Sequence, residues 1–255
     1  MSDGRHPRDR FITIYGRKPV LELLGQPDRR VARVLLDRRA RGPVAREILA
    51  RAEARGVEVE RVEAAAVTRL SRNAKQDQGV VADVEAPSMD ALTSWLARRD
   101  PETATNLWLL DGITNAANVG MILRSAVAFG VDGVVLPRRG CPEVGPLVIK
   151  ASAGIAYEAP ILRVASVKDA IGAASQHGVE LIALAGEAEA SLETVSVPRR
   201  CMVALGNETE GVSEAVRAAC GASWSIPMAP GAESLNVAVA ASVVGYELAR
   251  RRRRG

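Results

Sequence analysis

Apolar and polar residues alternate along the chain in blocks that predict strands followed by helices. The first block begins at Phe11, and its strands are short runs rich in Val and Leu. One helical segment of this block ends at Gly56, and glycine commonly ends a helix. We therefore expect a turn followed by a short helix within 14–24, strands at 31–37, 57–62 and 79–86, and helices at 46–56 and 64–71.

The second half of the chain repeats the alternation with longer helices and more continuous apolar strands. Strands that alternate with helices in this way are typical of a mainly parallel sheet, so the fold class is α/β. We expect strands at 107–110, 133–136, 160–164, 180–185, 201–205 and 223–226, and helices at 121–129, 166–177, 213–220 and 236–250.

Polar and proline-containing stretches divide these blocks into domains. Residues 1–10 are polar and basic, which predicts a loose arm, and residues 11–86 form a small α/β domain. Residues 87–105 carry one short helical pattern followed by Asp100-Pro101, which predicts a linker. The remainder, 106–255, is the second α/β domain.

The amino-acid composition limits the kinds of partner that the chain is expected to bind. Hydrophobic residues make up 47% of 255 residues, which is ample for packed cores, whereas aromatic residues make up only 3%. A surface that stacks bases on aromatic rings is therefore not expected. The net charge of +4 comes almost entirely from arginine, since the chain has only four lysines. This balance gives mild support for a nucleic-acid partner.

Histidine and cysteine usage removes several classes of chemistry. The two histidines are His6 in the basic arm and His177 at an expected helix C-terminus. Neither is placed to serve as a catalytic base or a zinc ligand, so we do not expect a histidine-based hydrolase or a histidine-ligated zinc site. The three cysteines follow no metal-ligand pattern, and we expect no metal. With no signal peptide and no apolar run long enough to span a membrane, we expect a cytoplasmic protein.

The first chemically suggestive stretch follows the strand at 107–110. That strand ends at Asp111-Gly112, and the amide side chains of Asn115 and Asn118 precede a helix that carries Arg124. In α/β sheets, ligands gather at the carboxyl ends of strands, so this stretch is a candidate edge of an active site. The alternative is an ordinary strand, turn and helix with an asparagine N-cap and a solvated arginine.

Two further loops follow strands late in the chain. The loop after the strand at 201–205 has the glycines of a phosphate loop but lacks its lysine, so a backbone-lined pocket for an adenosine-type ligand is one interpretation and a plain turn is the other. The last loop opens a helix rich in small residues. It is either part of the same pocket or simply the capped start of a core helix. The notable residues are Leu205, Gly206, Asn207, Glu208 and Gly211 in one loop, and Ile226, Met228, Ser234, Leu235 and Asn236 in the other.

Taken together, the three motifs resemble those of the SpoU-type RNA ribose methyltransferases, which belong to the SPOUT superfamily. They match at 115–124, 205–211 and 226–236, and the segment 14–86 is similar to the substrate-recognition domain of that family. The resemblance covers about residues 11–249. It implies a ribosomal-protein-like RNA-recognition domain followed by a parallel-sheet domain with a deep trefoil knot, a topology that hydrophobic patterning never predicts.

The resemblance also implies an activity and its partners. The reaction is methyl transfer from S-adenosylmethionine to a ribose 2′-hydroxyl of RNA, with guanosine of ribosomal RNA favoured and transfer RNA as the alternative substrate. It implies a homodimer, and the small-residue C-terminal helix is compatible with a symmetric contact.

Roles for individual residues follow from the resemblance. Because a guanidinium stays protonated, we interpret Arg124 as a group that binds the target phosphate and ribose and stabilises the developing alkoxide. The expected catalytic set is Arg124, Asn118, Glu208, Ser234 and Asn236. The expected cofactor-binding set is Leu205, Gly206, Asn207, Gly211, Ile226, Met228 and Leu235.

Two other functions compete with this reading. A non-catalytic RNA-binding protein of the same fold would be expected to lack Arg124 or Asn118, and both are present. A Rossmann-type methyltransferase needs a glycine-rich loop after its first strand, which residues 115–120 do not supply. The polar loop at 72–78 is either a plain surface loop or an RNA contact. The arginine run at 250–254 is either a phosphate contact or a solvated end.

Overall fold

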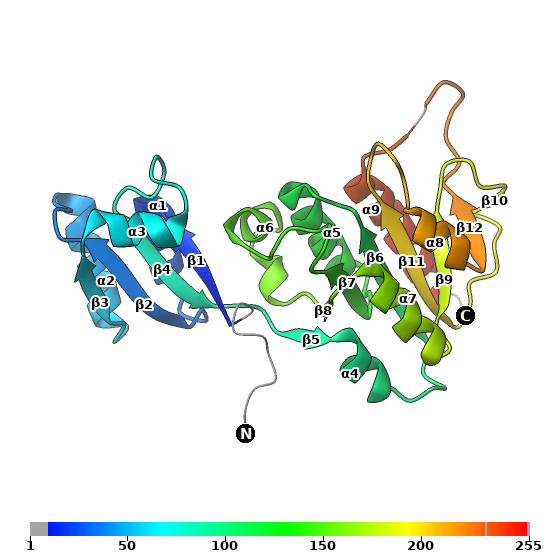
Figure 1. Cartoon of the computed structure of the whole chain (residues 1–255), viewed down its shortest axis with the longest axis horizontal. Coiled ribbons are helices and arrows are strands. Elements are labelled where there is room, and N and C mark those ends of the chain that lie inside the picture. Colours follow the sequence, from blue (N-terminus) through cyan, green and yellow to red (C-terminus); the bar gives the residue numbers. More distant parts are fainter. Residues whose placement is uncertain (1–9, 233, 254–255) are drawn as a thin grey trace. The chain divides into compact units, whose positions relative to one another are not determined.

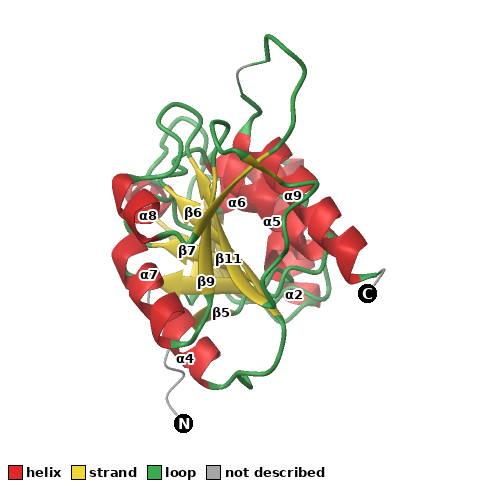
Figure 2. Ribbon diagram, turned by 90° about the vertical axis from the view of Figure 1, so that its right-hand side faces the viewer, coloured by secondary structure: helices red, strands yellow, loops and turns green. Residues whose placement is uncertain are grey.

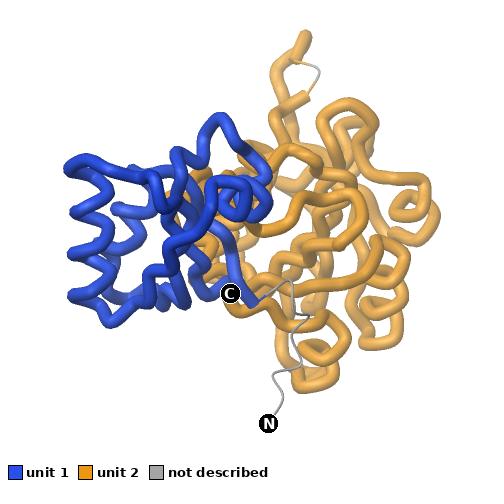
Figure 3. Tube along the Cα trace, turned by 60° about the vertical axis from the view of Figure 1, so that its left-hand side comes forward, with its two compact units in different colours: residues 1–86 blue, residues 87–255 orange. Residues whose placement is uncertain are grey.

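The computed structural model describes residues 10–232 and 234–253. The chain divides after Ala86 into two compact units, residues 1–86 and 87–255 (Figure 3). Apart from Arg10, the N-terminal arm expected at 1–10 lies outside the described residues. Each unit has its own sheet and its own buried residues, and each is described separately below.

The first unit is a four-stranded mixed sheet in the order β1-β4-β2-β3 (Figure 1). Strand β4 runs antiparallel to both β1 and β2, and β2 runs parallel to β3. On one face, Leu35 and Val81 pack against Val67 of α3. The elements are β1 (Phe11–Tyr15), α1 (Arg17–Leu24), β2 (Val31–Asp37), α2 (Pro43–Ala54), β3 (Val59–Val62), α3 (Ala64–Ser71) and β4 (Val80–Glu85).

The second unit is built on an eight-stranded sheet in the order β10-β12-β9-β11-β6-β7-β8-β5, and every pairing in it is parallel. The central strands β6 and β7 are buried along their whole length, as expected for a sheet covered on both faces. Its strands are β5 (Met89–Ala91), β6 (Thr105–Asp111), β7 (Gly133–Pro137), β8 (Ile161–Val164), β9 (Glu180–Leu184), β10 (Ala190–Ser191), β11 (Arg200–Gly206) and β12 (Ala222–Ser225).

Helices cover both faces of this sheet (Figure 2). Leu107 and Leu109 of β6 belong to the core that also contains residues of α4 and α7, whereas Trp108 points to the opposite face, against Gly245 of α9. Helices α4 (Leu92–Ala97), α7 (Val167–Gln176) and α8 (Glu214–Ala219) lie on one side; α5 (Ala116–Ala128), α6 (Pro146–Ala151) and α9 (Val237–Arg252) lie on the other. A short 3-10 turn, η2 (Ile155–Tyr157), follows α6.

The prediction of a linker at 87–105 is wrong for much of that segment, because residues 89–97 belong to the second unit's sheet and core. Met89–Ala91 pairs with β8 as the edge strand of the sheet. Leu92 and Leu96 of α4 are each only 1% exposed and join the main core. The sequence pattern misses this arrangement because the strand has only three residues, and its partner lies about seventy residues further along the chain.

The trefoil knot implied by the resemblance stays a prediction. Within the described residues, none of the helices combines the length and the apolar character that a membrane crossing requires.

Candidate functional site

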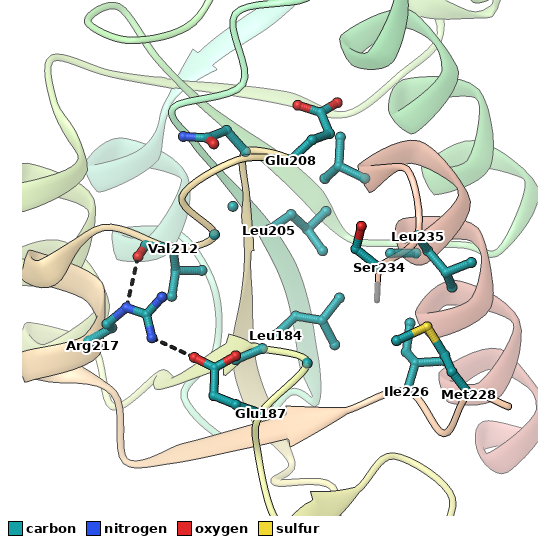
Figure 4. Close-up of a pocket in the computed structure, with 17 residues that line it drawn as sticks. Leu184, Glu187, Leu205, Glu208, Val212, Arg217, Ile226, Met228, Ser234 and Leu235 are labelled. Atoms are coloured by element: carbon teal, nitrogen blue, oxygen red, sulfur yellow. Dashed lines mark hydrogen bonds and ion pairs between the residues drawn. The ribbon is translucent and has the colours of Figure 1, made fainter. Parts of the chain in front are cut away.

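A cavity of about 410 Å³ opens at the carboxyl ends of neighbouring strands in the second unit (Figure 4). Its walls come from three segments that are far apart in sequence and follow β9, β11 and β12 respectively. This is the edge of a parallel sheet where ligands bind. The three segments lie within residues 184–187, 205–217 and 226–240.

The segment after β11 is a loop that closes on itself. The backbone amide of Asn207 donates to the carbonyl oxygen of Gly211 (3.1 Å), and the amide of Gly211 donates back to Asn207 (3.0 Å). The side-chain oxygen of Asn207 accepts from the amides of Thr209 (2.9 Å) and Glu210 (2.7 Å). These hydrogen bonds, all made within the loop itself, hold its cavity-facing side in place.

Gly206 shows how tightly this loop is folded. A Cβ atom at Gly206 would lie 2.1 Å from the carbonyl carbon of Gly211 and 2.3 Å from the amide nitrogen of Val212, both of them backbone atoms that cannot move aside. Gly211 itself has φ +69°, a conformation that favours glycine. The glycines of this motif are therefore required by the close approach of two backbone segments.

The last residue of β6, Asp111, anchors the chain just after the same loop. Asp111 is 4% exposed, and its carboxylate accepts a hydrogen bond of 2.6 Å from the backbone amide of Ser213. Ser213 is the N-cap of α8, so this bond satisfies an amide that has no partner within the helix. The turn signal Asp111-Gly112 thus marks a residue that anchors the cavity loop.

A polar network links all three sequence motifs. The side-chain amide of Asn118, which is 3% exposed, donates to the carboxylate of Glu208. Asn118 in turn accepts from the side-chain amide of Asn236 at 3.1 Å. Asn236 also caps α9 by accepting from the amide of Ala238 at 2.9 Å. The network holds the side chain of Glu208, and Glu208 is one of the residues that line the cavity.

Most of the expected site residues meet at this cavity. Asn118 and Asn236 reach it through Glu208. Arg124 does not line it; this residue is exposed on the same face of α5 as Met121. The expected residues that line the cavity are Leu205, Gly206, Asn207, Glu208, Gly211, Ile226, Met228, Ser234 and Leu235.

Sequence reasoning missed an ion pair at the mouth of the cavity. Arg217 of α8 lies 2.6 Å from the carboxylate of Glu187, which follows β9, and Figure 4 shows the two side chains meeting at one wall. Arg217 also donates to the backbone carbonyls of Val212 and Glu210. Its guanidinium lowers the pKa of Glu187 from the ordinary value. The only available signal was the position of Glu187 just after a strand.

The cavity has the size and lining of a site for a nucleoside-type cofactor. Its volume lies in the usual range for small-molecule pockets, about 300–1,000 Å³. Leu184, Leu205 and Leu235 supply apolar surface for a base, and the Gly206 loop supplies backbone groups. The ion pair of Glu187 and Arg217 at its mouth offers hydrogen bonds to hydroxyl and carboxylate groups. These residues fit S-adenosylmethionine.

The remaining chemistry in the described residues is limited. No group of three or more His, Cys, Asp and Glu side chains in this part of the chain is arranged to hold a metal ion. Burial raises the pKa of Cys141 to about 11 and that of Cys201 to about 12. Both thiols are therefore protonated near neutral pH and are poor nucleophiles.

Comparison with known protein families matches both units. The model described as the SpoU rRNA Methylase family matches residues 106–246. A second model, described as RNA 2′-O ribose methyltransferase substrate binding, matches residues 13–89.

Individual relatives match over nearly the whole chain. A protein of Coxiella burnetii named 23S rRNA (guanosine-2′-O-)-methyltransferase RlmB is 32% identical over 243 residues, which cover 94% of this chain and 96% of the relative. A protein of the same name from Xanthomonas campestris is 34% identical and covers 87% and 89%. The solved structure of the SpoU methyltransferase AviRb from Streptomyces viridochromogenes, in complex with AdoMet, aligns with a TM-score of 0.66 at 26% identity, covering 99% and 96%.

Proposed function

The chain belongs to the SpoU rRNA methylase family and is an S-adenosylmethionine-dependent RNA 2′-O-methyltransferase, and we propose that its target is a guanosine of ribosomal RNA. The observation that supports a working enzyme is the preformed cavity at the ends of β9, β11 and β12, with the Glu208–Asn118–Asn236 network beside it. Two relatives named as 23S rRNA guanosine methyltransferases support the choice of substrate.

When bound, S-adenosylmethionine would supply a methyl group on a sulfonium centre: the ribose oxygen would bond to the methyl carbon as the carbon–sulfur bond breaks and its electron pair stays on sulfur. The hydroxyl proton is released to water. In this proposal the backbone of the Gly206 loop and the side chains of Ile226 and Leu235 hold the cofactor, with Ser234 shaping the cavity wall. Positioning of this kind supplies much of the rate of a displacement reaction.

Arg124 acts on the RNA in this proposal. Its guanidinium is exposed and carries a permanent positive charge, so it binds the phosphate next to the target ribose and stabilises the charge that develops on the 2′-oxygen. Asn118 and Glu208 orient the ribose, and Asn236 holds Asn118 in place. Asn236 donates to the side-chain oxygen Oδ1 of Asn118. The side-chain nitrogen Nδ2 of Asn118 therefore points to Glu208 and donates to it.

We propose that the enzyme is a homodimer. An apolar stripe on α9, formed by Val239, Val243 and Tyr246, is 36–54% exposed, and Met121 of the neighbouring helix α5 is 40% exposed. The two helices pack together, and Ser125 and Ser242 are hydrogen-bonded at 2.8 Å. A second copy seated on this stripe would cover it by a symmetric contact. Arg124 shares the exposed face of α5 with Met121, so the dimer would border the reaction centre.

The rest of the proposal concerns location and topology. The reduced cysteines and a ribosomal RNA substrate support a cytoplasmic location. The trefoil knot is part of the proposal because of family membership.

The direct experiment is methyl transfer in vitro. Purified protein is incubated with tritiated S-adenosylmethionine and with deproteinised 23S ribosomal RNA or transfer RNA from a strain that lacks the protein, and the RNA is then digested to nucleosides. We expect label in 2′-O-methylguanosine from the ribosomal RNA. Label in the transfer RNA only would refute the choice of substrate, and label on a base would refute the chemistry.

A further inference from the structure

The sheet of the first unit brings four loops to one edge. Because β4 is antiparallel to β1 and β2, and β3 is parallel to β2, the carboxyl ends of β1, β2 and β3 lie beside the start of β4. Backbone bonds join these loops: Gly16 donates to Val80 at 3.1 Å, and Asp37 donates to Gly79 at 2.8 Å. We call this region the basic edge and define it as residues 15–18, 37–42, 62–64 and 72–79.

Charge is concentrated at the basic edge. It carries seven Lys and Arg residues against three Asp and Glu residues, and one of the three, Asp77, is only 5% exposed. The opposite edge of the same sheet carries four Arg residues against three Asp and Glu residues. The difference is therefore a property of one edge and does not follow from the arginine content of the whole unit. The opposite edge comprises residue 10 and residues 25–30, 55–58 and 85–86.

The loop at 72–79 is held rigidly from within. The carboxylate of Asp77 accepts from the hydroxyls of Thr68 (3.1 Å) and Ser71 (3.0 Å) and from the amide of Gly79 (2.9 Å). With Asp77 turned inward, the exposed side chains of Arg72 and Lys75 are presented to solvent from a fixed backbone. Binding through such a loop loses little conformational entropy.

The loop at 72–79 is also tied to the turn after β1. The backbone amide of Arg17 donates to the side-chain oxygen of Gln78 at 3.0 Å, and its guanidinium donates to the backbone carbonyl of Gln78 at 3.2 Å. Arg72 and Gln78 adopt φ values of +53° and +52°, which turn the chain sharply at both ends of the loop. The two loops therefore form one continuous surface.

Several cations on this surface have no competing partner. The side chains of Arg39, Arg72 and Lys75 are exposed and form no hydrogen bond or ion pair with any residue that the structure describes. Cations held on a rigid frame and not neutralised by carboxylates are suited to phosphate groups, which dominate the affinity of proteins for RNA. The oxygen of the exposed Gln76 amide accepts from Asn73 at 3.2 Å, and its nitrogen can donate to base edges.

We propose that the basic edge is the surface by which the first unit holds the RNA substrate, with Arg39, Arg72 and Lys75 contacting phosphates. This inference rests on the proposed function and adds to it the side of the unit that faces RNA. It also explains how a chain poor in aromatic residues binds RNA: by charge and hydrogen bonds, without base stacking.

The test compares two full-length variants that lose the same charge. Arg39→Gln with Lys75→Gln alters the basic edge, and Arg10→Gln with Arg30→Gln alters the opposite edge. The probe is deproteinised 23S ribosomal RNA from a strain lacking the protein, and binding is measured between about 50 and 200 mM KCl. We expect the basic-edge variant to bind about tenfold more weakly and its salt slope to fall by about two, one for each lost phosphate contact.

Kinetics and a rescue variant separate binding from folding. The KM for RNA should rise in the basic-edge variant while kcat and cofactor affinity stay within about twofold of wild type, because each lost phosphate contact lowers RNA affinity alone. Arg39→Lys with Lys75→Arg keeps both charges and should bind like wild type. Equal losses in both charge-removing variants, or no loss in either, would overturn the basic edge as the RNA surface while methyl transfer by the wild type continued. Conversely, RNA binding that depends on the basic edge without any methyl transfer would refute only the proposed function.

Discussion

Gly206 is the residue whose replacement the structure tolerates least at the cavity. In Gly206→Ala the new methyl group would meet the backbone of Gly211 and Val212 at about 2 Å, so the loop must open. We expect a stability loss of about 1–3 kcal/mol and no measurable binding of S-adenosylmethionine by calorimetry. Gly172→Ala in α7, where an added Cβ meets nothing within 4 Å, serves as the control and should bind normally. Normal cofactor binding by Gly206→Ala would show that this loop does not form the cofactor site.

Arg124 separates chemistry from cofactor binding. Arg124→Ala should lower kcat by about 10²–10³, as loss of a charge-stabilising donor does. Its affinity for S-adenosylmethionine should be unchanged because Arg124 does not line the cavity. Single-turnover methyl transfer and calorimetry on the same preparation give both values. A similar fall in cofactor affinity would contradict the role proposed for Arg124.

Single residues also mark the limit of what the sequence predicts. The two glycines and the asparagine of the loop after β11 were identifiable because a strand end followed by small and amide residues is a local pattern. The pairing of Asn118 with Glu208 joins residues 90 positions apart, and the pairing of Glu187 with Arg217 joins residues 30 apart. No local pattern contains such distances. The fold must bring these side chains together.

At the scale of elements, the end of α9 is more ordered than its arginine run predicts. Arg250 and Arg251 lie within the helix and pair with Glu247 at 2.7 Å and 2.6 Å. Arg251 also donates to the carbonyl oxygen of Leu192 at 2.5 Å. A solvated end is therefore wrong for these two arginines. Both pair with Glu247, and Arg251 attaches α9 to the segment before β11; Arg254 lies outside the described residues.

This attachment predicts a pH dependence. Hydrogen bonds from Arg250 and Arg251 lower the pKa of Glu247 from 4.5 to about 2, so the folded state favours the carboxylate. The stabilisation is complete above the unfolded pKa and is lost as the pH falls through the folded pKa. Glu247→Gln should lower Tm at pH 7, and the difference from wild type should vanish between pH 4.5 and about 2. Glu193→Gln, an exposed change in the same unit, should leave Tm unchanged throughout. A difference independent of pH would exclude this ion pair as its cause.

Long apolar strands and amphipathic helices were predictable, and the α/β class with a parallel sheet is confirmed. Short strands were not. β5 and β10 have three and two residues, so their conformation depends on sheet partners and not on local propensity. β1 has the β-branched and aromatic residues that favour a strand, but its last two residues, Ile14 and Tyr15, were assigned to the segment of the first helix. The order β12-β9-β11 in the sheet is also set by pairing between distant segments and not by local sequence. That order brings together the loops that form the cavity.

At the scale of the whole molecule, the apolar stripe on α9 predicts an association between two copies. Val239→Glu with Val243→Glu places two charges on the stripe and should convert the dimer into a monomer, as measured by sedimentation velocity. Ala218→Glu with Ala219→Glu puts the same charge on exposed positions of α8, on the other side of the sheet, and should leave the dimer intact. A wild-type protein that sediments as a monomer at micromolar concentration would refute the dimer.

The central claim is ribose methylation of one ribosomal RNA guanosine by this chain. It is tested most directly by mass spectrometry of 23S ribosomal RNA from paired strains with and without the gene. We predict that a single 2′-O-methylguanosine disappears when the gene is deleted, returns with the wild-type gene, and does not return with Arg124→Ala. Identical ribose methylation in the two strains, or loss of a base methylation instead, would contradict the account.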